Sequence, residues 1–210
     1  MTTPSLPPIS SLPTADEETI KLVLDTLFEP SPEIHAIALP AIQQKRRILA
    51  NPGVSADLPP PSTAPQPATV PDNLTFTSYT SLIEHVGMLM TQLTVSTVPA
   101  AREKLHGILS SHPRLGAKKV DSIQSRAEQA QLNAGAADEA ERLAALNQEY
   151  EGRFPGLRYV VFVNGRSRDV IMRDMRRRID RGDIGAEERE GIQAMVDIAI
   201  DRARKLLASS

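Results

Sequence analysis

The chain has 210 residues and only 3% aromatic residues with no Trp, so its core must be built from aliphatic side chains. It contains no cysteine, which excludes disulfides, thiolate metal sites and a cysteine nucleophile. A net charge of −2 gives no electrostatic reason to expect nucleic acid or an anionic membrane as a partner. No apolar run approaches the length of a transmembrane span.

The N-terminal residues 1–13 hold four prolines and no basic residue. This composition predicts a disordered tail and is unlike a secretory or mitochondrial signal. The C-terminus ends Ala208-Ser209-Ser210 and not in the peroxisomal Ser-Lys-Leu address. Together with the absence of cysteine, these features favour a cytoplasmic location, with a peroxisomal one as the alternative.

Apolar residues recur with helical spacing along most of the remaining chain, which predicts an all-α fold in one domain, residues 14–208. Thr14, with Glu17 three residues later, resembles a capping box at the start of the first helix. Residues 51–71 hold seven prolines among small polar residues and predict a flexible insertion within the domain. The expected helices are residues 14–28, 33–49, 78–93, 99–110, 121–133, 138–154, 167–181 and 186–208.

Residues 159–163, Tyr-Val-Val-Phe-Val, interrupt this pattern and predict a short extended segment. No second convincing strand exists to pair with it, so its backbone groups need other partners. They can pack against helix ends and water, or they can be offered to a ligand that carries amide groups.

His112 is the strongest candidate for a catalytic side chain. Pro113 fixes the backbone after it and restricts His112 to an extended conformation. A fixed imidazole in a loop suits proton transfer near neutral pH.

Ser125, Glu128 and Gln129 stand at positions i, i+3 and i+4 and therefore share one face of a helix. A solvated polar face is one explanation. The thin apolar stripe of this helix favours another, in which the face lines a wet pocket. A carboxylate and a carboxamide together can accept from N–H groups and donate to carbonyls.

The last helix places Arg202 beside its apolar stripe. Such an arginine either extends to water or points at a buried anion. Arg204 lies two positions further and is the alternative for the same role.

Two blocks of sequence, in this order, resemble the 2-oxo-4-hydroxy-4-carboxy-5-ureidoimidazoline (OHCU) decarboxylases of urate degradation. The first block is His112-Pro113-Arg114-Leu115-Gly116 followed by Ser125-x-x-Glu128-Gln129. The second is the run Leu-Asn-Gln-Glu-Tyr at residues 146–150, then Arg-Phe at 153–154, then Val-Asn-Gly-Arg-Ser-Arg at 163–168. The resemblance is good over residues 74–207 and weak over residues 15–48.

The resemblance implies a cofactor-free decarboxylase that converts OHCU to (S)-allantoin in purine catabolism. It implies His112 and Glu128 as catalytic residues, with no metal. The substrate-binding residues that it implies are Pro113, Ser125, Gln129, Val161, Val163 and Arg202. The expected partner is the small ureido-imidazoline substrate, without nucleic acid or membrane, and the chain is a candidate homodimer.

This sequence departs from the family pattern at Phe154-Pro155-Gly156-Leu157-Arg158-Tyr159, where many members have Phe-Gly-Phe-Pro-Phe. The change brings an arginine near the expected pocket wall. Two alternatives therefore stay open: a paralogue that acts on another ureide or hydantoin, and a catalytically silent helical interaction module that uses the basic residues between 173 and 181. The silent module requires His112, Glu128 and Arg202 to be scattered.

Overall fold

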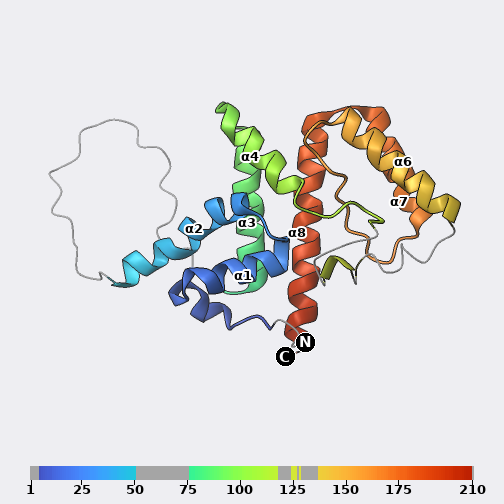
Figure 1. Ribbon diagram of the computed structural model, residues 1–210. Helices are drawn as coiled ribbons and strands as arrows, with labels where there is room; N and C mark the ends of the chain where they lie inside the picture. The colour runs from blue at the N-terminus through green and yellow to red at the C-terminus, as the bar shows by residue number, and fades with distance from the viewer. Residues whose placement is uncertain (1–4, 51–75, 118–123, 127, 129–136, 210) are drawn as a thin grey trace.

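The computed structural model describes residues 5–50, 76–117, 124–126, 128 and 137–209, without the side chains of 44–50 and 137 (Figure 1). Most of these residues are helical, and the described part of the chain contains no strand. The elements are η1 (Ile9–Thr14), α1 (Glu17–Phe28), α2 (Pro32–Ala50), α3 (Tyr79–Thr94), α4 (Pro99–Leu109), α6 (Ala137–Arg153), α7 (Arg168–Arg181) and α8 (Ile184–Ala208). The predicted all-α fold is confirmed, and none of these helices is long and apolar enough to cross a membrane.

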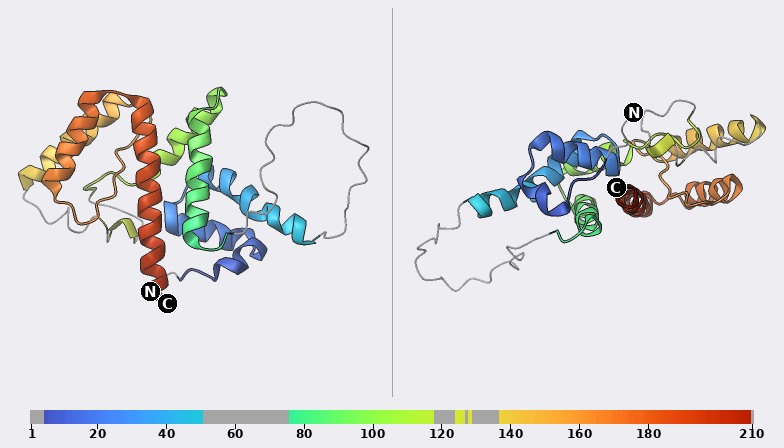
Figure 2. Two further views of the ribbon diagram at one scale, coloured as in Figure 1. Left: turned by 180° about the vertical axis from the view of Figure 1, so that it is seen from behind. Right: turned by 90° about the horizontal axis from the view of Figure 1, so that it is seen from below.

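The long helix α8 stands between two groups of helices (Figures 1 and 2). α1 and α3 pack on one side of it, and the antiparallel pair α6 and α7 lies on the other. Its buried face includes Ile192, Met195 and Ala199. α3 approaches so closely that a Cβ atom on Gly87 would lie 2.6 Å from Val196, so this contact requires a glycine. α8 therefore lies at the centre of the fold, between the two groups of helices.

The N-terminal segment is more ordered than its composition suggested. Residues Ile9–Thr14 form a 3-10 helix in which Leu12 is fully buried. The Tyr79 hydroxyl donates to the Pro7 carbonyl at 2.7 Å and ties the segment to α3. The expectation of a disordered tail over residues 1–13 is thus wrong for residues 5–13, because two leucines (Leu6 and Leu12) anchor them in the core.

The first helix also begins later than expected. Its N-cap is Asp16, whose carboxylate accepts from the Thr19 amide at 2.7 Å. Thr14 instead donates to the Ser11 carbonyl within the 3-10 helix. The capping box predicted at Thr14 is therefore wrong. The Pro-rich insertion at 51–71 lies outside the described residues.

Residues 157–163 run between α6 and α7 without regular secondary structure. The guanidinium of Arg178 donates to the Val160 carbonyl at 3.2 Å. Arg166 donates to the carbonyls of Phe162 and Val163. Arginine side chains thus replace a second strand as partners for several carbonyls of this segment.

Candidate functional site

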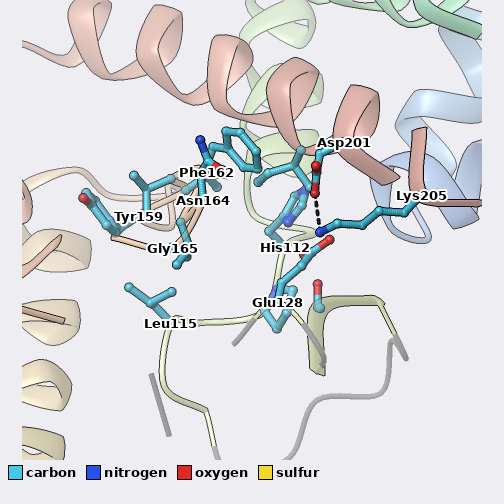
Figure 3. A pocket seen from close by; sticks show the side chains of 15 residues that line it. His112, Leu115, Glu128, Tyr159, Phe162, Asn164, Gly165, Asp201 and Lys205 are labelled. Atoms are coloured by element: carbon cyan, nitrogen blue, oxygen red, sulfur yellow. Dashed lines mark ion pairs between the residues drawn. The ribbon is translucent and has the colours of Figure 1, made fainter. Parts of the chain in front are cut away.

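A pocket of about 320 Å³ lies where α8, the loop after α4 and residues 159–165 meet (Figure 3). It has both polar and aliphatic walls. The residues that line it are His112, Pro113, Leu115, Ser125, Glu128, Tyr159, Val160, Val161, Phe162, Val163, Asn164, Gly165, Ile198, Asp201 and Lys205.

The loop that carries His112 is held at two points. Arg158 donates from Nη1 to the His112 carbonyl at 3.0 Å. Asn147, on α6, donates from Nδ2 to the Leu115 carbonyl at 3.0 Å. Gly116 has φ of 76°, and a Cβ atom there would lie 2.7 Å from Leu143. The arginine that departs from the family pattern and the asparagine of the second block therefore both position the His112 loop.

The imidazole of His112 is buried, and its Nε2 atom has no hydrogen-bond partner among the described residues. The pKa of His112 is lowered to about 3, mainly by burial and also by the charge of Arg202, while Glu128 opposes the shift. The ring is therefore neutral at physiological pH and can accept a proton from a group placed in the pocket.

Glu128 belongs to a buried ion cluster centred on Arg202. The guanidinium donates to Glu128 from Nε at 2.7 Å and from Nη2 at 2.9 Å. Nη2 also lies 2.6 Å from Glu29 and 2.9 Å from the Ser125 hydroxyl oxygen. The Ser125 hydroxyl donates to Glu29 at 2.5 Å. Of the four side chains in this cluster, that of Glu128 reaches furthest toward solvent, with 22% of it exposed.

A second ion pair stands on the pocket wall. Asp201 and Lys205, four residues apart on α8, lie 2.5 Å apart (Figure 3). The lysine side chain is 68% exposed, so it is accessible to an incoming anion.

The structure brings most of the predicted site residues together. His112, Pro113, Ser125, Glu128, Val161 and Val163 all line the pocket. Arg202 is 2% exposed and does not line it, while Arg204 is exposed. Gln129 lies outside the described residues.

Sequence reasoning missed Glu29, Asp201 and Lys205. The last two could have been found, since they follow Ile198 at i+3 and i+7 and share its face of α8. Glu29 had no comparable signal, because it lies 96 residues from Ser125 along the chain. Among the described residues, no group of three His, Asp or Glu side chains is arranged to hold a metal ion.

The basic residues of α7 are paired with carboxylates and do not form an open cationic face. Arg173 pairs with Asp169, and Arg176 with Glu149. Arg177, Arg178 and Arg181 also have carboxylate partners.

Comparison with known proteins identifies the family of this chain. A family model described as OHCU decarboxylase matches residues 60–204, more than half of the chain. The chain belongs to the OHCU decarboxylase family. A search of curated proteins found no match. The family resemblance expected from the two sequence blocks is thus confirmed, and OHCU decarboxylases, as a family, are decarboxylases of urate degradation.

Proposed function

We propose that the protein decarboxylates OHCU to (S)-allantoin without a cofactor. The observation that carries the proposal is a buried, neutral imidazole, that of His112, in the pocket that Glu128 also lines; its Nε2 has no hydrogen-bond partner in the part of the chain that the structure describes. A pocket of about 320 Å³ is within the range of small-ligand sites.

The reaction needs no external electron sink. The C–C bond to the carboxylate breaks, and its electron pair flows into the adjacent ring C=N bond, whose nitrogen takes up a proton. The resulting enol then loses its hydroxyl proton while the neighbouring ring carbon gains one, which forms the carbonyl and the stereocentre. One proton is consumed overall and CO₂ is released. The protein has to orient the ring and deliver the carbon-bound proton to one face.

His112 suits the tautomerisation. Because burial holds its pKa far below neutral, the ring enters the reaction as a base and removes the hydroxyl proton. The negative charge of Glu128 stabilises the imidazolium that forms. His112 then returns the proton to carbon. Pro113 fixes the direction from which it does so.

Recognition of the ring uses polar groups around the pocket. Glu128 accepts from ureido N–H groups, and Ser125 is a further polar contact. No described residue forms a hydrogen bond with the Val161 backbone, which is therefore available to the amide edge of the ligand, next to Val163. Gln129 remains a proposed contact from its family match.

The deciding experiment is a stereospecific assay by circular dichroism, with OHCU freshly generated from urate. The protein is expected to accelerate appearance of the (S)-allantoin signal over the spontaneous reaction. Racemic product at the spontaneous rate would rule out the proposed activity.

A further inference from the structure

Glu29 is a carboxylate outside the 60–204 span that matches the family. It follows α1, is 3% exposed, and its carboxylate contacts Arg202 and Ser125. Arg202 in turn binds Glu128 through two nitrogens. A continuous chain of contacts therefore leads from the N-terminal helices to the carboxylate that lines the pocket.

The contacts of Arg202 leave it no free nitrogen for a ligand. Nε and Nη2 donate to carboxylates, and Nη1 lies 3.3 Å from the Leu27 carbonyl and 3.5 Å from that of Thr26. Its charge is shared between two carboxylates, of which Glu29 is the more deeply buried. Arg202 thus acts on the pocket through Glu128.

The backbone at Glu29 is in an unusual conformation. Its φ of 79° and ψ of 152° lie in a region that side-chain-bearing residues rarely adopt. Pro30 follows and favours the extended ψ. The Glu29 amide donates to the Asp25 carbonyl and closes α1. A glycine would meet these backbone requirements with less strain, so the side chain itself is what this position retains.

We infer that Glu29 is a positioning residue of the site, which holds Arg202 so that Glu128 is presented to the pocket at a fixed distance and with a fixed share of the arginine charge. Without Glu29, Arg202 is left with one carboxylate partner and draws Glu128 away from the ligand. This role rests on the proposed function, because it is defined by what Glu128 does to a bound ring.

The test compares three variants of the full chain. Glu29→Gln keeps the shape and removes the charge, and Glu29→Gly also relieves the backbone. Glu33→Gln is the matched control: Glu33 is a neighbouring carboxylate that accepts from Ser31 and is not among the described hydrogen-bond partners of Arg202. Circular dichroism and melting temperature establish that each variant is folded at the assay temperature.

Both Glu29 variants are expected to lower kcat about tenfold or more while KM changes less than threefold, because a misplaced Glu128 fails mainly in the transition state. Loss of a negative charge also makes protonation of the site harder, so the acid limb of the pH–rate profile shifts to lower pH by about one unit. The control keeps the parent kcat and profile. A folded Glu29→Gln variant with parent kcat and an unmoved acid limb would overturn the inference.

Failure of the proposed function can be told apart from failure of this inference. If the parent protein does not turn over OHCU, the exchange rate of the Arg202 Nη2 hydrogens, measured by NMR, still reports the contact between Arg202 and Glu29. It is expected to rise in both Glu29 variants and not in Glu33→Gln. Equal exchange in all three would mean that Glu29 does not hold Arg202.

Discussion

Two buried arginines, Arg178 and Arg202, each lie at the centre of an ion cluster, and each is 2% exposed. Arg178 on α7 pairs with Glu187, whose side chain is fully buried and also binds Arg181 and the Tyr150 hydroxyl. Arg202 on α8 pairs with Glu29 and with Glu128. In both clusters a buried guanidinium is paired with carboxylates.

The clusters differ in where their last carboxylate lies. The side chain of Glu187 is fully buried and is not among the residues that line the pocket, so the Arg178 cluster is closed and contributes to packing between α7 and α8. Glu128 is one-fifth exposed and lines the pocket that also holds the unpartnered His112 nitrogen. The carboxylate of the arginine–carboxylate pair is thus buried on one side of α8 and open to a ligand on the other. Perturbing the first should change stability, and perturbing the second should change turnover.

The largest expected effect is on turnover. His112→Asn should lower kcat/KM for OHCU by about 10²–10⁴-fold, since this is the usual contribution of a general acid–base group. The melting temperature should change little, because the imidazole Nε2 forms no hydrogen bond with any residue that the structure describes. His106→Asn is the control, a histidine that pairs with Glu188 away from the pocket and should keep parent turnover when folded. Near-parent activity of His112→Asn would remove the assigned role.

The closed cluster should respond in the opposite way. Glu187→Gln leaves two arginines beside a neutral group, and breaking a buried ion pair typically costs about 3–5 kcal/mol. Urea unfolding should show this loss, while folded protein keeps its KM and most of its kcat. Glu149→Gln removes an exposed partner of Arg176 and should hardly change stability. Loss of turnover without loss of stability in Glu187→Gln would contradict the separation of the two clusters.

Periodicity was sufficient to predict most of the described helices and the element that each described site residue occupies. His112 follows α4, and Arg202 lies on the inward face of α8, which is one of the two orientations that its place beside the apolar stripe left open. These predictions succeed because amphipathic spacing is local. The order of residues 5–13 was missed, because it depends on contacts with α3, such as that between Tyr79 and Pro7.

The charge balance of the site could not be predicted locally. The role of Arg202 depends on Glu29, 173 residues away, and a buried carboxylate with positive φ has no pattern in the sequence. The low proton affinity of His112 also arises from burial by distant segments and not from its neighbours in the chain. Each of these features is a property of the assembled pocket.

A smaller effect is expected on the pH dependence of stability. The pKa of His112 is about 3 in the folded protein and near 6.5 when unfolded. Between pH 3 and pH 6.5 the unfolded chain therefore binds one proton more than the folded protein. The contribution of the neutral His112 ring to the free energy of unfolding is complete above pH 6.5 and is lost as the pH falls. Between pH 6.5 and 5 it amounts to about 2 kcal/mol. The difference in unfolding free energy between parent and His112→Asn should narrow or reverse by that amount, and a constant difference would mean that the ring is not desolvated.

The smallest effect is expected at the pocket rim. Lys205 is exposed and paired with Asp201, so Lys205→Met should leave the melting temperature almost unchanged. An anionic substrate that passes near the ammonium gains about 1 kcal/mol in a water-like environment, which corresponds to about fivefold in KM with kcat unchanged. Salt screens such an exposed attraction, so the difference between parent and variant should shrink at high ionic strength. Arg204→Met is the matched control, because it removes an exposed cation from the same helix that does not line the pocket. Equal rises in KM in the two variants would show that the net charge of α8, and not the position of Lys205, attracts the substrate.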